Sequence, residues 1–356
     1  MEIIQKERGS ISNANVGWIE LVKQLKINSF SKIFILTDSN TKIDCLPYFL
    51  SKVNFKQQPE LLEMHSGEQN KNISTCIELW TTLSEKGADR NSLLINLGGG
   101  VVTDLGGFIA STFRRGIEFI NIPTTLLAMV DASVGGKNGI DLGNLKNQIG
   151  IIRNPLLVLI DIEFLKTLPQ AELTSGYAEM LKHGLIYSEE YWNELKQFSA
   201  ANMNEVNQLI WASVKIKNEV VTEDPLEKGR RKTLNYGHTL GHAIESYCLS
   251  SEEKKTLLHG EAIAIGMILA TYISTILCNF PKQKLEAVTS TFLKHFQKEF
   301  FTKKDIESII DLLKYDKKNS HGEINFVLLE NFGKHRVNCH VENQLIYEAF
   351  NYYDNY

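Results

Sequence analysis

Residues 92–107 read SLLINLGGGVVTDLGG, which is a short apolar run, three consecutive glycines and then a segment with helical character. A strand that runs through glycines into a helix brings backbone N–H groups and the helix N-terminus to one point, where they can hold a phosphate. The stretch is not the pattern G-x-G-x-x-G, because Thr103 stands at the third glycine position. A tight strand–helix turn explains it equally well. The stretch therefore predicts a parallel α/β unit, and it does not decide whether the turn binds a phosphate. Asp104, in the first turn of the predicted helix, is suited to cap that helix or to hold a ribose or nicotinamide group.

Three further short apolar runs are also followed directly by residues that form turns or helix caps. Lys32–Leu36 precedes the residues TDSN, Phe119–Ile122 precedes PTT, and Leu156–Ile160 precedes Asp161. Short apolar runs that end in Gly, Asp or Thr, with helices between them, are typical of parallel strands in βαβ units. In such sheets ligands bind beyond the carboxyl ends of the strands.

After Pro169 the apolar residues follow helical spacing. Steps of three and four residues recur over the segments 171–186, 206–221, 239–247, 261–277 and 304–313. Fifteen of the 24 glycines lie in residues 1–150, which also indicates two halves of different architecture. We therefore predict an α/β domain with a mainly parallel sheet over residues 1–168 and an all-α domain over residues 169–356.

Composition excludes several classes of partner. The 38 basic and 42 acidic residues give a net charge of −4, so the chain has no basic field for nucleic acid or an acidic membrane. The five cysteines are odd in number and form no C-x-x-C pair, which favours a reducing compartment, the cytoplasm, over a disulfide framework. The apolar stretch Ile263–Cys278 is shorter than the ~20 residues that span a bilayer, and we interpret it as a buried helix.

Residues 123–147, PTTLLAMVDASVGGKNGIDLGNLKN, concentrate polar side chains in a segment that we interpret as a long loop. Loops of this length usually have a function, because a connecting loop would be shorter. A lysine that follows a glycine pair, as Lys137 does, suits a phosphate or a carboxylate. A solvated excursion is the alternative.

A metal site is suggested by Glu179, His238, His242 and His259. His238 and His242 are four residues apart and share one face of a helix, which is a spacing used by helical zinc sites. Spacing does not decide whether both histidines are ligands or whether one handles protons. Lys182 and Lys217 stand in otherwise apolar helices, where an inward-facing lysine needs an anionic partner.

Several motifs in order resemble the 3-dehydroquinate synthase family of sugar phosphate cyclases. They are GGGVVTDLGG, IPTTLLAMVDASVGGKNGID, LKNQIG, SGYAEMLKHGLI, LNYGHTLGHAIE and LLHGEAIAIGM, and the resemblance runs from about residue 30 to about residue 335. It implies an N-terminal domain that binds NAD and a helical domain that holds a divalent cation, zinc or cobalt. At the matching positions the metal ligands are Glu179, His238 and His259, and His242 is a substrate or proton-transfer residue.

The resemblance also implies the remaining site residues. Those that contact NAD are Asp38, Asn40, Glu68, Lys71, Gly99, Gly100, Asp104, Thr124, Thr125, Lys137, Lys146, Phe164 and Thr167. Catalytic roles fall to Lys182, Lys217, Arg231, Asn235, His242 and Asp131. Substrate binding falls to Lys137, Asn147, Arg115 and one of Lys317 and Lys318. Arg115 matches an arginine that members lend to the neighbouring subunit, which implies a homodimer.

The implied reaction converts 3-deoxy-D-arabino-heptulosonate 7-phosphate to 3-dehydroquinate and phosphate, a step of the shikimate pathway. It proceeds by transient oxidation, phosphate elimination, reduction and intramolecular aldol closure. Another sugar phosphate cyclase and a metal-dependent polyol dehydrogenase are the alternatives. The sequence departs from the family pattern at Thr103, Gly106, Met129 and Leu145, where glycine, alanine, glutamine and glycine are common; none of these positions is a charged site residue.

Overall fold

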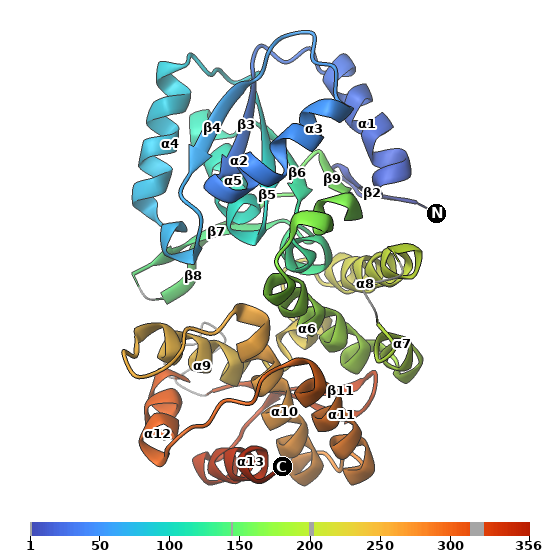
Figure 1. The fold of residues 1–356 in the computed structure, drawn as a ribbon, viewed down its shortest axis with the longest axis vertical. Helices are drawn as coiled ribbons and strands as arrows, with labels where there is room; N and C mark the ends of the chain where they lie inside the picture. The colour runs from blue at the N-terminus through green and yellow to red at the C-terminus, as the bar shows by residue number, and fades with distance from the viewer. Residues whose placement is uncertain (1, 144, 199–202, 314–323) are drawn as a thin grey trace. The chain divides into compact units, whose positions relative to one another are not determined.

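The computed structural model describes residues 2–143, 145–198, 203–313 and 324–356. The chain divides into two compact units, Met1–Pro169 and Gln170–Tyr356 (Figure 1). The domain boundary expected from the sequence lies one residue before this division. Each unit is described by itself.

Unit 1 is built on a seven-stranded sheet with the strand order β1-β2-β9-β6-β5-β3-β4. All neighbouring strands are parallel except β1 and β2, which pair in antiparallel fashion. The mainly parallel sheet predicted for this half is confirmed. The strands are β1 (Ile3–Gln5), β2 (Ser10–Asn13), β3 (Ile33–Asp38), β4 (Glu60–Met64), β5 (Leu93–Gly98), β6 (Glu118–Pro123) and β9 (Leu157–Ile160).

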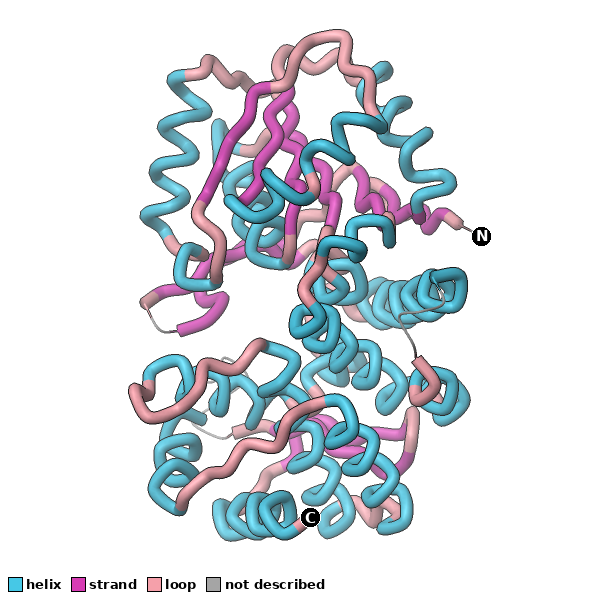
Figure 2. Tube along the Cα trace, viewed as in Figure 1, coloured by secondary structure: helices cyan, strands magenta, loops and turns pink. Residues whose placement is uncertain are grey.

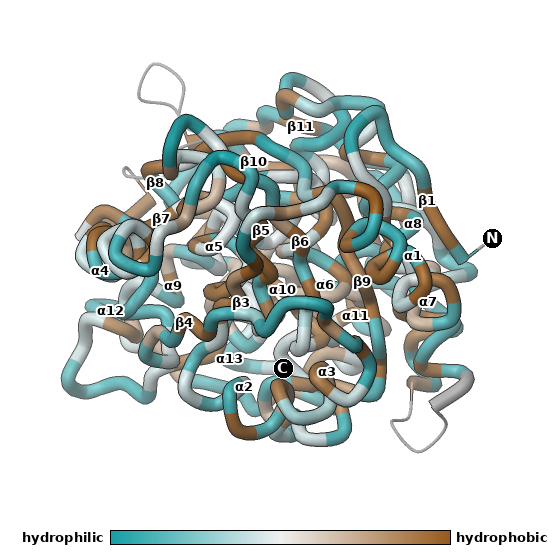
Figure 3. The backbone as a smooth tube through the Cα atoms, turned by 90° about the horizontal axis from the view of Figure 1, so that it is seen from above, coloured by the Kyte–Doolittle hydropathy of each residue, from teal (hydrophilic) through white to brown (hydrophobic). Residues whose placement is uncertain are grey.

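Helices connect the strands of unit 1 and pack on the sheet (Figure 2). The apolar side chains of β5 and α5 share one buried core, in which Leu94, Leu105 and Ile109 are fully enclosed. Hydrophilic segments are prominent in the peripheral loops (Figure 3). The helices are α1 (Ala14–Ile27), α2 (Ser39–Asp44), α3 (Leu46–Lys52), η1 (Glu68–Asn70), α4 (Ile73–Glu85), α5 (Gly100–Thr112), η2 (Phe113–Arg115), η3 (Ala128–Ala132) and η4 (Ile162–Thr167).

The segment 123–147, interpreted from sequence as a long loop, is largely ordered as secondary structure. After the short π-helix η3, strands β7 (Lys137–Leu142) and β8 (Leu145–Ile152) form an antiparallel two-stranded ribbon. Gly139 and Gly150 face each other across this ribbon, and an added Cβ on either would lie 2.6 Å from a backbone oxygen of the opposite strand. The glycines are therefore explained by close strand pairing as well as by loop formation.

Unit 2 is helical, as predicted, but its described residues also include a pair of strands. Strands β10 (Phe326–Asn331) and β11 (Lys334–Cys339) form an antiparallel hairpin, which the predicted all-α domain does not include. The predicted helical segments correspond to α6 (Gln170–Tyr187), α8 (Met203–Glu223), α9 (His238–Ser250), α10 (His259–Leu277) and α12 (Lys303–Leu312). The unit also contains α7 (Glu189–Leu195), η5 (Arg230–Asn235), α11 (Lys282–His295) and α13 (Asn343–Asn355).

Helix α10 is the central helix of unit 2 and packs against α6, α9, α11 and α13. By length and composition alone it could cross a membrane, but 72% of its most apolar window is buried inside the protein. This is the behaviour of a core helix, as expected for the apolar stretch that ends at Cys278. Two glycines make the packing close: an added Cβ would lie 2.0 Å from the carbonyl oxygen of Ser175 at Gly260, and 2.1 Å from that of Gly237 at Gly266.

Candidate active site

The glycine-rich turn of unit 1 joins the end of β5 to the start of α5. Gly99 is the N-cap residue of α5 and provides no side-chain cap, so the first-turn N–H groups face outward from the carboxyl end of the sheet. An added Cβ on Gly98 would lie 2.6 Å from Val102, and one on Gly99 would lie 3.0 Å from Thr125. The glycines thus make a tight turn and also leave a helix N-terminus that is suited to a phosphate, so both sequence interpretations apply.

A buried polar cluster lies beside this turn. The ammonium of Lys71, whose side chain is 4% exposed, lies 2.7 Å from Asp104 Oδ2 and 2.6 Å from Asn147 Oδ1. Lys146 lies 3.4 Å from Glu68. Burial alone would lower the pKa of Lys71, but the charges of Asp104 and Glu68 outweigh it and raise that pKa above its usual value. The structure therefore brings five predicted site residues from three segments, η1 with the residue after it, α5 and β8, into one network.

The other predicted NAD residues are more dispersed. Asp38 Oδ1 accepts hydrogen bonds from the N–H groups of Asn40 and Thr41 and so caps α2. Thr124 is buried at the end of β6, and Thr125 Oγ1 accepts from the N–H of Ala128. Two members lie on η4: Phe164, which is buried with its ring edge-on to Tyr48 at 5.1 Å, and Thr167, which donates to the Phe164 carbonyl.

Three predicted residues of unit 1 stand nearer the surface. Asp131 is half-buried on η3, and Lys137 is exposed at the start of β7. Arg115 is exposed and has φ of +71°, directly after Arg114 with φ of +50°. Two successive non-glycine residues in the left-handed region are strained, and such strain persists only where the surrounding structure holds it.

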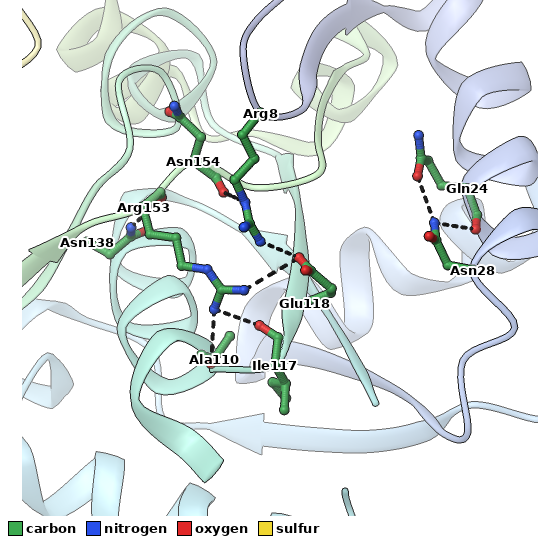
Figure 4. A network of polar contacts seen from close by, with 9 residues as sticks. All are labelled: Arg8, Gln24, Asn28, Ala110, Ile117, Glu118, Asn138, Arg153 and Asn154. Carbon is green, nitrogen blue, oxygen red and sulfur yellow. Dashed lines mark hydrogen bonds and ion pairs between the residues drawn. The ribbon is translucent and has the colours of Figure 1, made fainter. Parts of the chain in front are cut away.

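A network of ion pairs and hydrogen bonds holds the start of β6, at Ile117 and Glu118 (Figure 4). Glu118 Oε2 lies 2.5 Å from Arg8 and 3.5 Å from Arg153, and Arg153 also donates to the carbonyl of Ile117 at 2.8 Å. This network ties β6 to the segment that follows β8. The turn that presents Arg115 is therefore anchored on its C-terminal side.

The metal candidate of unit 2 is formed by side chains from three helices. Glu179 on α6 is fully buried, and its Oε1 lies 3.5 Å from His238 Nε2 on α9 and 3.7 Å from His259 Nε2 on α10. Ligands of a tetrahedral Zn²⁺ with bonds of about 2.0–2.1 Å are separated by about 3.4 Å. One carboxylate and two imidazoles at this spacing fit a divalent cation.

The second ring nitrogens of His238 and His259 both have acceptors nearby. His238 Nδ1 lies 3.1 Å from the carbonyl of Tyr236, and His259 Nδ1 lies 3.3 Å from Glu245 Oε2. Burial would lower the pKa of His259, but the carboxylates of Glu245 and Glu179 outweigh it and raise that pKa to about 9. A cation that binds here therefore displaces a proton.

His242 stays close to this cluster. Its ring centroid lies 5.1 Å from that of His238 and 5.8 Å from that of His259. The three histidines each offer a ring nitrogen within 4.8 Å of the other two. The geometry accommodates His242 as a ligand or as a proton-handling neighbour, so the ambiguity left by the sequence spacing is not removed by distance.

The predicted cations of unit 2 are largely buried. Lys182 pairs with Glu179 Oε2, which is the anionic partner its position in an apolar helix requires. Lys217 and Arg231 are 6% and 3% exposed. Arg231 donates to the carbonyl of Pro225 at 2.8 Å.

Two predicted residues remain. Asn235 donates to Glu227 Oε1 at 2.5 Å. Lys317 and Lys318, one of which was expected to bind phosphate, lie outside the described residues.

Comparisons with known proteins agree on one family. Family models described as 3-dehydroquinate synthase N-terminal and C-terminal match residues 61–175 and 176–319. The chain is 46% identical over 336 residues to 3-dehydroquinate synthase of Parabacteroides distasonis, with 94% of each chain covered. It is 39% identical over 331 residues to that of Campylobacter jejuni subsp. doylei, covering 90% of this chain and 92% of the relative. The chain belongs to the 3-dehydroquinate synthase family.

Solved structures extend the comparison beyond the 3-dehydroquinate synthase family. A 2-deoxy-scyllo-inosose synthase complexed with carbaglucose-6-phosphate, NAD⁺ and Co²⁺ superposes with a TM-score of 0.84 at 26% identity over 98% of both chains. A 2-epi-5-epi-valiolone synthase of Streptomyces hygroscopicus with NAD⁺ and Zn²⁺ has a TM-score of 0.82 at 22% identity over 99% of this chain and 98% of its own, and it shows the shared fold. The predicted fold class and family are confirmed.

Sequence reasoning about the 3-dehydroquinate synthase motifs overlooked two acidic residues. Glu245 follows His238 by seven residues and His242 by three, which places all three on one face of α9. Asp224 accepts hydrogen bonds from the backbone N–H groups of Lys228, Gly229 and Arg231. The helical spacing of Glu245 was a usable signal, whereas the turn around Asp224 had none.

Proposed function

We propose that the chain converts 3-deoxy-D-arabino-heptulosonate 7-phosphate to 3-dehydroquinate and inorganic phosphate. The observation that supports this most is the convergence of Glu179, His238 and His259 in a member of the 3-dehydroquinate synthase family. The 46% identity to a 3-dehydroquinate synthase, against 26% to an inosose synthase, favours this substrate over that of a related cyclase. The enzyme is a carbon–oxygen lyase whose transient oxidation and reduction leave no net redox change.

The cofactors implied are NAD and a divalent cation, zinc or cobalt. When bound, NAD⁺ accepts and later returns a hydride, and the cation polarises substrate oxygens. Glu179, His238 and His259 hold the cation in unit 2. In unit 1, NAD is held by the turn at Gly99 and Gly100, by Asp104 and by the other predicted contacts, including the network of Lys71, Glu68 and Lys146.

The buried cations of unit 2 bind the two anionic groups of the substrate. A carboxylate and a phosphate together carry more charge than one lysine neutralises, and Lys182, Lys217 and Arg231 supply three cations in low-dielectric surroundings. Lys182 also occupies Glu179 Oε2, which leaves Oε1 directed at the histidines. Lys182 therefore takes part both in binding the substrate and in orienting the carboxylate that binds the cation.

Proton handling and orientation are assigned to His242 and Asn235. His242 lies beside His238 and His259 and would move protons to or from substrate hydroxyls. Asn235 is oriented by Glu227 Oε1 and presents the rest of its amide to substrate hydroxyls. Asp131, Lys137 and Asn147 are the substrate contacts of unit 1, and one of the two lysines at 317 and 318 contacts phosphate.

The active form is a homodimer in which Arg115 serves the site of the neighbouring subunit. Its exposure on a strained, anchored turn supports this role. Mixing inactive Arg115→Ala and His259→Ala proteins under conditions of subunit exchange should restore about a quarter of wild-type activity, because half the dimers are mixed and each has one complete site. A mixture no more active than its two components would refute the shared site. The cytoplasm is the expected location.

Phosphate release across a panel of sugar phosphates tests the substrate. We expect release from the heptulosonate phosphate and none from glucose 6-phosphate or sedoheptulose 7-phosphate. Preferential release from either of the last two would assign the chain to another cyclase activity. Accumulation of free NADH with a polyol substrate would instead indicate a dehydrogenase.

A further inference from the structure

We infer that Glu245 is a positioning residue of the metal centre, which acts through His259 by fixing which ring nitrogen faces the cation. The inference rests on the proposed function only in that the site binds a divalent cation. It concerns a residue on α9 that provides no ligand itself. Its support is the placement of Glu245 on the helix, its burial and its contact with α10.

The first support is that Glu245 lies on the same face of α9 as the two histidines of that helix. His238, His242 and Glu245 occupy positions i, i+4 and i+7, and such residues line one face of a helix. Glu245 is only 6% exposed. Acidic side chains are almost never buried to this extent unless they are paired. The buried carboxylate therefore faces the same side as the ligand histidine of its own helix.

The second support is the direction of the hydrogen bond. Glu245 Oε2 lies 3.3 Å from His259 Nδ1, and an ionised carboxylate can only accept. Nδ1 is therefore the protonated nitrogen of the neutral ring, which leaves the lone pair on Nε2. That nitrogen is the one that lies 3.7 Å from Glu179 Oε1. The pair thus selects the tautomer and the ring orientation in which His259 can ligate.

The third support is the contrast between the two ligand histidines. The ring of His238 is held by the backbone carbonyl of Tyr236 two residues away. The ring of His259 is held by a charged side chain from another helix, fourteen residues distant in sequence. A carboxylate on the outer nitrogen orients a ligand imidazole and also increases its basicity. The affinity of His259 for the cation therefore depends on the side chain of Glu245, which can be changed by substitution.

Zinc affinity of the metal-free, full-length protein, measured by chelator competition, tests the inference. Loss of such an outer partner typically weakens metal binding 10–100-fold, and we expect this for Glu245→Ala. Glu245→Gln should lose less, because its amide oxygen still accepts from Nδ1. Glu252→Ala, an exposed acidic residue in the loop after α9, is the matched control and should bind zinc as the wild type does. The visible absorption of the Co²⁺-loaded protein should change for Glu245→Ala alone among these three.

A double variant separates positioning from a general effect on the fold. If Glu245 acts through His259, then His259→Ala/Glu245→Ala binds zinc no more weakly than His259→Ala. The inference is overturned if Glu245→Ala binds zinc within about threefold of the wild type, or if the two losses multiply in the double variant. If Glu245→Ala does not fold, Glu245→Met, which keeps the length of the side chain but has no oxygen acceptor, decides by the same criteria. A wild-type protein that binds no zinc would overturn both this inference and the proposed metal site, whereas unchanged binding in the variants overturns this inference alone.

Discussion

Substitution of Gly260 by alanine is predicted to disable the metal site without touching a ligand. Gly260 follows His259 on α10, and its N–H donates to Ser175 Oγ on α6 at 2.9 Å. An added Cβ would lie 2.0 Å from the carbonyl oxygen of Ser175 and 2.5 Å from its carbonyl carbon. Both are backbone atoms, so no rotamer change relieves the overlap, and the two helices must separate.

The size of this separation follows from the contact. Real Cβ–oxygen contacts are rarely shorter than about 3.0 Å, so α6 and α10 must part by about 1 Å at this point. Ser175 is one turn before Glu179, and the 3.7 Å gap from Glu179 Oε1 to His259 Nε2 would open to about 4.7 Å. Two metal bonds of about 2.1 Å in line span only about 4.2 Å. A cation held by the proposed ligands Glu179, His238 and His259 would then lose one of them.

Zinc affinity by chelator competition and phosphate release are the assays. We expect Gly260→Ala to bind zinc at least about 100-fold more weakly than the wild type, beyond the usual effect of an outer partner. Ile276→Ala, at a half-exposed position on the same helix, is the control and should behave as the wild type. Zinc affinity and turnover at wild-type level in Gly260→Ala would refute the reasoning that this close contact sets the ligand spacing.

Three other perturbations have defined outcomes. Gly106→Ala places a Cβ 2.0 Å from Asn96 Oδ1 and should lower the unfolding free energy of unit 1, measured by denaturation, by about 2 kcal/mol. In an Asn96→Ala background the same substitution should cost less than about 1 kcal/mol, and equal costs in the two backgrounds would contradict this explanation. Burial opposes ionisation of Asp305, yet hydrogen bonds from Lys254 and Tyr247 hold its pKa at about 2, below the usual value of about 3.9. The charge therefore contributes about 2 kcal/mol of stability above pH 4, which is lost as the pH falls toward 2. Asp305→Asn should therefore destabilise at pH 7, with a difference that shrinks below pH 4; a pH-independent difference would contradict the linkage. Chelation should abolish phosphate release and added Zn²⁺ or Co²⁺ should restore it; full activity in chelator would contradict the metal role.

Local pattern was sufficient for the elements that position the site. The apolar run before Gly98 and the glycines after it predict β5 and α5, because both signals are contained in adjacent residues. The helical steps that predict α6 and α10 belong to helices buried on most sides, so the spacing is dense. In these segments local propensity and tertiary packing favour the same structure.

Features that depend on packing between distant segments were not available from the sequence. The ribbon β7–β8 carries glycines and exposed residues that resemble a loop, and only its antiparallel register makes it a strand pair. The significance of Glu245 depends on how α9 lies against α10, although its spacing placed it on the correct face. For His242 the sequence identified the residue, but neither its spacing in the sequence nor its distances in the structure decide between a ligand and a proton-transfer residue.

The proposed function requires that NAD act as a recycled cofactor in a metal-dependent phosphate elimination. The most direct measurement is phosphate released from 3-deoxy-D-arabino-heptulosonate 7-phosphate per NAD⁺ added, with NADH absorbance followed in the same sample. We expect many equivalents of phosphate per NAD⁺, 3-dehydroquinate as the product, no net NADH, and loss of phosphate release in chelator. Stoichiometric NADH, or phosphate release that needs neither NAD⁺ nor metal, would contradict it.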